Sequence, residues 1–440
     1  MARTFTVDTA VIGGGIAGLA AAFELQRRGG QAVVFEASQQ PGGLLAPICI
    51  NGFTFDTAVH LSFAKEPEVR EIFDRTKYLT HNPVSFCHDA KSGLWLKHPI
   101  QNNLFPLTLD EKVELLTGLV QAPAGEITNY RDWLVQQYGE PIAARWPLVY
   151  SEKYWTVPAE RLGTAWVGQR MRRADLKEVM AGALSSETPN HYYVSEMRYP
   201  EKGGYYAFIE PLVDAVELQL GRRASEVRSK ERRVRFADGS EAVYRNLIST
   251  MPLPNLVEIM NDVPDNIRAD AASLFATSID LISVGFRRPA VSPSLWFYIY
   301  DQDIWAARAY SPDKKSAKNV PEGCSALQFE IYSSRERPQT HTPEELKLNT
   351  VQGLAKMGLA EPEDIIFVEH HHVPFANVVF DLGMEARRDR VRGWVRAQDV
   401  ILAGRFGEWD YLWSNQSMMS GIRAARDVSD LTAERHSRSA

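Results

Sequence analysis

The sequence predicts an α/β fold in which a parallel sheet is interrupted by a mostly helical insertion and by an antiparallel sheet. Three observations carry this prediction. Residues 5–37 alternate in the order strand, glycine-rich turn, helix and strand, which is one βαβ unit. Residues 76–183 show helical periodicity, whereas residues 277–379 contain short alternating apolar runs around one helix. A buried strand returns at residues 399–402, so both ends of the chain are expected to build the parallel sheet.

The glycine-rich turn of the first unit predicts a nucleotide site. Gly13, Gly15 and Gly18 follow a strand and open a helix, and Glu36 ends the next strand. Gly13 permits the tight turn, Gly15 lets backbone approach a pyrophosphate, and Gly18 allows close packing of helix on strand. The helix N-terminus offers amides to the phosphates, and Glu36 can accept hydrogen bonds from two ribose hydroxyls. The turn therefore predicts a Rossmann-like site for a dinucleotide without a 2′-phosphate.

The later segments divide the chain further. Residues 76–190 are expected to form the helical insertion. Residues 191–250 end in a hairpin with Asp238-Gly239 at its turn, followed by a buried strand that resumes the parallel sheet. Residues 251–385 are expected to form the antiparallel sheet domain. The dinucleotide-binding domain is thus predicted to comprise residues 1–75, 191–250 and 386–440, an interrupted Rossmann-like domain.

Composition excludes several other classes of protein. The 440 residues are 45% hydrophobic and 24% charged, with a formal net charge of −6 and no concentrated basic region, so we expect no nucleic-acid partner. No apolar run reaches the roughly 18 residues needed to span a membrane. The three cysteines, Cys49, Cys87 and Cys324, are widely spaced and suggest neither a disulfide framework nor a thiolate metal site. A cytoplasmic location is the expectation.

Two further glycine segments distinguish FAD from NAD. Gly42 and Gly43, six residues after Glu36, resemble the second glycine pair of the amine oxidase and protoporphyrinogen oxidase flavoproteins. Gly404 and Arg405, after the last predicted strand, resemble the element that closes around the flavin in that superfamily. The resemblance implies FAD as the cofactor, in an FAD-binding domain assembled from both ends of the chain.

Within that superfamily the chain resembles the UDP-galactopyranose mutases over most of its length. Five segments in the same order carry the likeness: FDTAVHLSF, WLKHPIQNNL, KYWTVP with AWVG, YPEKGG, and GRFGEWDYLWSNQ. The resemblance implies flavin contacts from Gly203, Gly204, Asn415 and Gln416 beside the glycines above. It implies that the catalytic side chains are His60, Arg308 and Tyr411, and that Asn102, Trp155 and Trp166 line the substrate site.

The resemblance also implies a reaction. In those mutases reduced flavin acts as a nucleophile: its N5 attacks the anomeric carbon, a nucleotide diphosphate departs, and the sugar reopens and recloses with no net redox change. An FAD-dependent pyranose–furanose isomerisation of an activated sugar is therefore expected, with an external reductant that keeps the flavin reduced. His60 is expected to donate to the flavin edge and Tyr411 to reach a phosphate.

Departures from the mutase pattern leave an alternative open. The mutase arginine that grips the diphosphate corresponds to Leu148 here, and a family tyrosine corresponds to Asn377 or Phe380. Arg308 matches the second family arginine. Because a bidentate arginine is hard to replace at a phosphate, a flavin oxidoreductase acting on an amine or alcohol is the alternative function. Substitutes for the missing arginine are expected among Arg145, Lys153, Arg170 and Arg172.

Two further interpretations, a metal site and a flavin-binding protein without catalytic activity, have weaker support from the sequence. His370, His371 and His372 are consecutive on a predicted strand, where neighbouring side chains point to opposite faces, so they are not expected to bind one metal ion. A flavin-binding partner protein without catalytic activity is disfavoured, because several polar side chains are expected to converge on the flavin.

Overall fold

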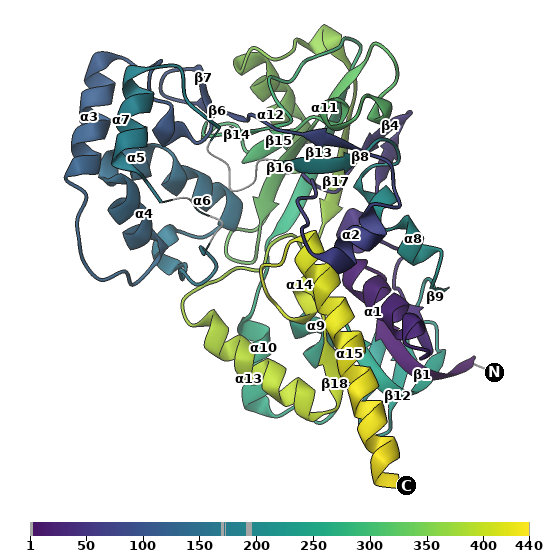
Figure 1. Ribbon diagram of the computed structural model, residues 1–440. Coiled ribbons are helices and arrows are strands. Elements are labelled where there is room, and N and C mark those ends of the chain that lie inside the picture. The colour runs from purple at the N-terminus through teal and green to yellow at the C-terminus, as the bar shows by residue number, and fades with distance from the viewer. Residues whose placement is uncertain (1–2, 169–170, 172, 191–195, 440) are drawn as a thin grey trace.

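The computed structural model describes residues 3–168, 171, 173–190 and 196–439. Two sheets organise the fold, with helices on their faces (Figure 1). The first sheet has the order β10-β11-β12-β1-β2-β9, and β18 pairs with β12. Its strands are β1 (Thr4–Ile12), β2 (Ala32–Phe35), β9 (Glu217–Gln219), β10 (Ala224–Arg228), β11 (Arg233–Phe236), β12 (Glu241–Ser249) and β18 (Val400–Leu402).

The parallel strands of this sheet come from distant parts of the chain. β1 pairs in parallel with β2 and β12, and β12 pairs in parallel with β18. The antiparallel hairpin of β11 and β12 turns at residues 237–240, where the sequence places Asp238-Gly239. Thus residues 4–35, 217–249 and 400–402 share one sheet, and the predicted interrupted α/β fold is confirmed.

The helices on this sheet pack through small side chains. α1 (Ile16–Arg27) is rich in alanine, and its Ala17, Ala20, Ala21 and Ala22 are almost fully buried. The C-terminal helix α15 (Ser414–Ser439) lies alongside α1 (Figure 1). At their crossing a Cβ on Gly421 would lie 2.0 Å from the carbonyl oxygen of Ala17, so this close approach requires glycine. Among the described residues, no helix combines the length and apolarity needed to cross a membrane.

The second sheet has the order β17-β13-β16-β15-β14-β6-β7. Most of its pairs are antiparallel, but β6 runs parallel to β14. Its strands are β6 (Phe86–Asp89), β7 (Leu94–Lys97), β13 (Ser278–Phe286), β14 (Trp296–Ile299), β15 (Arg308–Tyr310), β16 (Ser325–Ser333) and β17 (Ile365–Val373).

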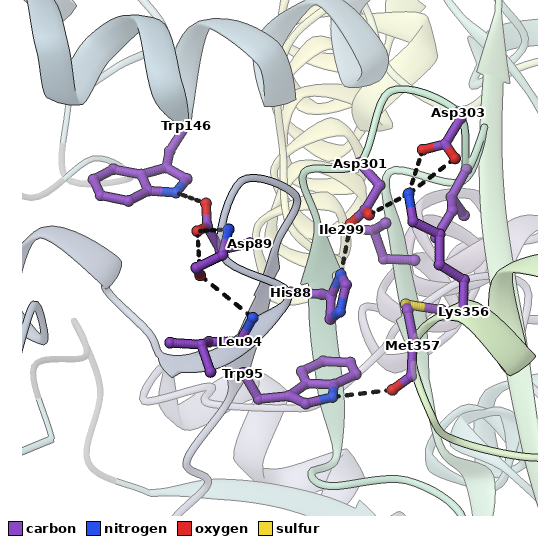
Figure 2. Close-up of polar contacts among 12 residues, drawn as sticks. His88, Asp89, Leu94, Trp95, Trp146, Ile299, Asp301, Asp303, Lys356 and Met357 are labelled. Atoms are coloured by element: carbon purple, nitrogen blue, oxygen red, sulfur yellow. Dashed lines mark hydrogen bonds and ion pairs between the residues drawn. The ribbon is translucent and has the colours of Figure 1, made fainter. Parts of the chain in front are cut away.

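Residues 86–97 correct the sequence-based division, because they form β6 and β7 rather than part of a helical insertion. Figure 2 shows the polar contacts of these two strands, which the apolar pattern of the sequence does not reveal. β6 buries polar side chains: His88 Nδ1 bonds Asp301 Oδ2 at 2.6 Å, and Asp89 Oδ1 accepts from Trp146 Nε1 at 2.8 Å. Lys356 completes the network with an ion pair of 2.9 Å to Asp301. A strand is predicted from its pattern of apolar residues. Buried polar residues interrupt that pattern, and the partners that stabilise them are brought close only in the folded chain.

The helical part lies beside this edge of the second sheet (Figure 1). Three of its helices begin at side-chain caps: Thr108 forms a capping box with Glu111, and Asn129 and Asp175 each accept a backbone amide of the first turn. They are α3 (Leu109–Val120), α4 (Tyr130–Tyr138), α5 (Glu140–Arg145), α6 (Pro147–Trp155) and α7 (Leu176–Leu184).

The remaining elements connect these parts. The helices are α2 (Pro67–Phe73), α8 (Glu210–Val213), α9 (Leu253–Ile259), α10 (Asp265–Ser273), α11 (Pro312–Lys315), α12 (Pro343–Lys356), α13 (Met384–Ala397) and α14 (Gly404–Gly407). The short strands are β3 (Ile48–Ile50), β4 (Phe53–Phe55), β5 (Tyr78–His81) and β8 (Met197–Pro200). The 3-10 turns are η1 (Gly43–Leu45), η2 (Ile100–Asn102), η3 (Ala159–Arg161), η4 (Tyr205–Phe208), η5 (Ala317–Asn319) and η6 (Pro362–Asp364).

Candidate active site

The turn between β1 and α1 has room for a ligand at one glycine and none at the other two. A Cβ on Gly13, whose φ is +104°, would lie 2.2 Å from Thr250 Oγ1, and one on Gly18 would lie 2.0 Å from the carbonyl oxygen of Gly13. A Cβ on Gly15 would meet nothing within 4 Å. α1 has no side-chain cap and no acidic residue in its first turn. Its free amides and positive dipole end therefore face open space at Gly15, as a pyrophosphate site requires.

The carboxylate of Glu36, which the sequence predicts to bind a ribose, accepts hydrogen bonds from backbone amides. Glu36 Oε2 accepts from the amide of Gly14 at 2.6 Å, and Oε1 accepts from the amide of Ser38 at 2.8 Å. Each oxygen keeps a second lone pair, so ribose hydroxyls can still donate to it. The second glycine pair packs on the same turn: the amide of Gly42 donates to Gly14 O at 2.8 Å, and a Cβ on Gly43 would lie 3.3 Å from Gly15 Cα.

The glycine-rich turn at residues 13–18, Glu36 and the Gly42-Gly43 pair form the candidate nucleotide cradle. Gly404, from the C-terminal part of the chain, packs against the same cradle. Gly404 has φ +79°, and a Cβ there would lie 2.7 Å from the Ala17 side chain. Its amide donates to Ser420 Oγ of α15 at 2.8 Å. These close approaches, the open space at Gly15 and the orientation of Glu36 fit the adenosine diphosphate part of FAD. The sequence therefore locates residues that the fold brings to one place from both ends of the chain.

Arg405 extends from this cradle toward a cluster of aromatic residues. Its NH2 donates to Asn377 Oδ1 at 2.7 Å, and its NH1 donates to Leu412 O at 3.1 Å. Its guanidinium lies 4.7 Å from the ring centroid of Tyr411. The sequence assigned Arg405 to the cofactor alone, but these contacts place it equally at the candidate substrate side.

The aromatic cluster joins α6 to the C-terminal segment. Tyr154 and Tyr411 share a hydrogen bond of 2.9 Å between their hydroxyls, and Tyr154 also donates to Asn377 Oδ1 at 3.2 Å. The ring of Trp155 lies 5.4 Å from Tyr411 and 4.8 Å from Trp166. The structure thus brings together Trp155, Trp166 and Tyr411, as the sequence predicts. Tyr154 lies in the segment KYWTVP that the resemblance points to, but the sequence assigns it no role of its own.

Arg308 reaches the same cluster from β15. Its guanidinium lies 5.7 Å from the ring of Tyr154, and its Nε donates to Glu330 Oε2 at 2.7 Å. Burial alone would lower the pKa of Arg308, but the attraction of Glu330 raises that pKa well above its usual value. Arg308 therefore stays charged. Glu330, fully buried on β16, was not anticipated from sequence, since it occupies an alternating strand pattern without any motif.

His60 lies in a turn that packs against the Gly203-Gly204 loop. Asp56, which opens this turn, accepts the amide of Tyr205 at 2.8 Å, and a Cβ on Gly204 would lie 3.1 Å from the same Oδ1. The His60 ring lies 5.3 Å from the Tyr205 ring. Burial lowers the pKa of His60 to about 4, so the imidazole is neutral at pH 7. Its Nδ1 lies 3.3 Å from Ala58 O and therefore carries the proton, which leaves Nε2 an acceptor rather than the expected donor.

Three predicted site residues make other contacts. Asn102 is buried and donates to Glu178 Oε2 of α7 at 3.0 Å, so its side chain serves the helical part. Asn415 donates to Glu66 Oε1 at 2.8 Å, and Gln416 Oε1 accepts the amide of Trp413 at 2.9 Å. Both belong to the first turn of α15, which reaches the flavin-side loop through a bond of 2.7 Å between the hydroxyls of Ser414 and Tyr205.

Leu148, at the position of the family arginine, is half-buried against the main apolar core. On α6, Tyr150 stacks on Tyr154 at 5.5 Å, whereas Leu148 and Glu152 line a separate hollow of about 190 Å³. Leu148 itself supplies no positive charge for a diphosphate. A larger hollow of about 390 Å³ lies at the amino-terminal ends of β1 and β2 and shares no residue with the cluster.

Two of the residues expected to substitute for the family arginine, Lys153 and Arg145, bind other groups of the protein. Lys153 Nζ donates to the backbone oxygens of residues 299, 301 and 304 at 2.8–2.9 Å. Arg145 pairs with Asp89 at 2.6 Å and with Glu111 at 3.0 Å. Arg170 and Arg172 lie outside the described residues.

The consecutive histidines occupy β17, as expected for a strand. His370 Nε2 and His372 Nδ1 bond the same oxygen of Asp280, at 2.7 and 2.9 Å. His371 lies between them in the strand, so its side chain points to the opposite face. In the part of the chain that the structure describes, no group of three or more ligating side chains is arranged to hold a metal ion.

The geometry defines a flavoprotein scaffold, and comparison with known proteins gives the family. The chain belongs to the flavin containing amine oxidoreductase family, whose model matches residues 16–429. Family membership implies FAD binding, which the cradle described above fits. The superfamily identified from the sequence is thus confirmed.

Solved structures show the same fold. A reduced UDP-galactopyranose mutase superposes with a TM-score of 0.90 at 24% identity, over 97% of this chain and 96% of the other. A protein described as a putative protoporphyrinogen oxidase from Exiguobacterium sp. 255-15 gives 0.73 at 18% identity, over 96% and 98% of the two chains. Putrescine oxidase bound to putrescine gives 0.65 at 16%, over 97% and 100%.

A curated relative matches locally. Protoporphyrinogen oxidase 2 of Arabidopsis thaliana, chloroplastic/mitochondrial, is 42% identical over 65 residues, which cover 15% of this chain and 13% of that protein. This match supports the superfamily and covers too little of either chain to carry an activity.

Proposed function

We propose that this protein is an FAD-dependent mutase that isomerises a nucleotide-activated sugar between its pyranose and furanose forms. The observation that carries the proposal is the charge of the aromatic cluster. Two guanidinium groups lie against it: that of Arg308 is 5.7 Å from the ring of Tyr154, and that of Arg405 is 4.7 Å from the ring of Tyr411. The carboxylate of Glu330 neutralises one of them, and His60 is uncharged at pH 7. The site therefore keeps a positive charge and favours an anionic substrate such as a sugar diphosphate.

The same charge argues against the alternative of amine oxidation. An amine substrate arrives as an ammonium ion, which the remaining positive charge of Arg405 repels. Binding such a cation would need an unpaired carboxylate, whereas Glu330 is already bonded to Arg308 and to the hydroxyl of Tyr332. The fold likeness to the reduced mutase, at a TM-score of 0.90 against 0.65 for putrescine oxidase, supports the same choice.

Each group of residues has a role in this proposal. Reduced FAD, when bound, supplies the nucleophile of the reaction. Arg308 stabilises the leaving diphosphate, because charge that develops on a departing phosphate is best met by fixed guanidinium donors. Tyr411 and Tyr154 offer a hydroxyl pair to the same phosphates. Trp155 and Trp166 supply a flat apolar wall that positions the sugar and excludes water. The neutral His60 keeps its Nε2 as an acceptor at the flavin side.

The experiment is a comparison of redox states. The purified protein, reduced with dithionite under anaerobic conditions, is incubated with a panel of nucleotide sugars, and the isomers are separated by chromatography. We expect conversion of at least one nucleotide sugar by the reduced protein and none by the oxidised protein, with no net oxidation. An external reductant is then the required partner. Substrate-dependent flavin reduction with oxygen consumption, and no isomerisation, would establish the oxidoreductase instead.

A further inference from the structure

Glu330 contacts both Arg308, on the candidate substrate side, and the turn that carries His60, on the candidate flavin side. It lies on β16, is fully buried, and accepts hydrogen bonds with both oxygens. Oε2 accepts from Arg308 Nε at 2.7 Å and from the Tyr332 hydroxyl at 2.5 Å. Oε1 accepts from the amide of Val59 at 3.1 Å, directly before His60. A single buried anion thus connects the candidate substrate arginine to the candidate flavin-side turn.

The strand makes this connection rigid. β15 and β16 pair with Arg308 opposite Glu330, so the ion pair is a cross-strand pair of fixed register. Two residues earlier on the same face, Gln328 accepts the amide of Ala58 at 3.1 Å and donates to Ser283 Oγ at 3.1 Å. Consecutive amides of the turn are therefore held by alternate side chains of one strand.

The turn itself requires such support. Ala58 has φ +68°, a left-handed conformation that is unfavourable for a residue other than glycine. The carbonyl of Ala58 is also the partner of His60 Nδ1. This carbonyl and the amide of Val59 belong to the same peptide unit, so Glu330 and His60 bond to opposite ends of one rigid group.

We propose that Glu330 is a positioning residue that couples an anion bound at Arg308 to the turn that carries His60. This inference rests on the proposed function, because it assumes that Arg308 receives a phosphate. An anion that engages the guanidinium competes with Glu330 for its donors. The carboxylate, drawn less strongly to Arg308, then holds the amide of Val59 more tightly. By linkage, the anion must bind the oxidised and the reduced protein with different affinity if the turn also responds to the flavin.

Only a carboxylate satisfies this position. Three donors point at Glu330: an amide, a guanidinium N–H and a hydroxyl. Glutamine has one acceptor oxygen, so Glu330→Gln must present its NH₂ group either to Val59 or to Arg308, and one side of the connection breaks. Tyr332→Phe is the matched control, because it removes one donor to the same carboxylate and leaves both sides connected.

The test uses the FAD-loaded protein with inorganic pyrophosphate as the probe. Two responses are measured: hydrogen exchange of the segment 56–60, and the flavin midpoint potential. In the wild type and in Tyr332→Phe we expect saturating pyrophosphate to slow exchange at Val59 at least threefold. We also expect a shift in the potential, with a tenfold affinity difference between redox states appearing as about 30 mV for a two-electron couple. Glu330→Gln should bind pyrophosphate and lose both responses.

Each outcome decides the matter. Wild-type exchange that is unchanged when pyrophosphate binds overturns the inference and needs no variant, so a Glu330→Gln protein that fails to fold does not protect it. Responses in Glu330→Gln equal to those of the wild type also overturn it. Because pyrophosphate binding requires no turnover, either result leaves the proposed mutase reaction standing, while a lack of isomerisation by the reduced protein would refute that reaction independently.

Discussion

The buried ion pair between Lys315 and Asp56 offers a test of how the flavin-side loop is held. Lys315 Nζ lies 2.7 Å from Asp56 Oδ2, and the two side chains are 0% and 1% exposed. Asp56 also accepts the Tyr199 hydroxyl at 2.9 Å and the amide of Tyr205 at 2.8 Å. Lys315→Met keeps the volume and removes the cation, leaving a buried carboxylate with two neutral donors. Breaking such a pair from one side costs about 3–5 kcal/mol.

The double variant separates lost charge from lost packing. In Asp56→Asn with Lys315→Met neither position carries a charge. The amide oxygen can still accept from Tyr205, and its NH₂ can donate to the Tyr199 oxygen. We expect the double variant to recover more than half of the loss. Recovery stays incomplete because the ammonium also lies 3.7 Å from the Tyr310 ring, a contact worth about 0.5–2 kcal/mol.

The assay is urea denaturation at pH 7.5. Unfolding is monitored through tryptophan fluorescence, and loss of the cofactor is monitored through the release of flavin. Lys315→Met should unfold at lower urea and lose FAD first, because Asp56 anchors the residue that follows Gly204. The reasoning would be refuted if Lys315→Met were as stable as the wild type. A double variant no more stable than Lys315→Met would refute it as well, because the loss would then lie in packing rather than in an uncompensated charge.

Three further predictions concern the cradle and the site. Gly18→Ala should abolish FAD retention, seen as a colourless protein, because its Cβ would lie 2.0 Å from the backbone oxygen of Gly13 and move the turn. Arg308→Ala should weaken pyrophosphate binding at least tenfold in calorimetry while FAD content stays unchanged, since a lost charge-assisted bond costs about 1.5–3 kcal/mol. Because burial lowers the pKa of His60 to about 4, the unfolded chain takes up a proton near pH 6.5 that the folded protein refuses, so stability should fall from pH 6.5 toward pH 4. His60→Gln should make that fall shallower in denaturation midpoints measured across the interval without removing it, because burial lowers the pKa of His98 to about 4 as well; an unchanged slope would contradict the prediction.

The sequence by itself determined the nucleotide cradle. Gly13 and Gly18 are required by contacts with backbone and side chains a few ångströms away, and such local requirements are written as glycine spacing that a reader of the sequence can recognise. Trp155, Trp166 and Tyr411 were predicted by a different route, from segments that resemble a known family, and the structure places their rings close together.

Only the tertiary structure decided how charge is distributed over the site. Glu330 and Lys315 belong to no recognised motif, and each pairs with a distant residue: Glu330 with Arg308, 22 positions away, and Lys315 with Asp56, 259 positions away. The burial that makes these pairs strong depends on the whole second sheet, not on local spacing. For the same reason β6, with His88 and Asp89 buried against distant partners, was taken for part of a helical insertion. A buried polar side chain is stable only with its partner, and the identity of that partner is a property of the fold.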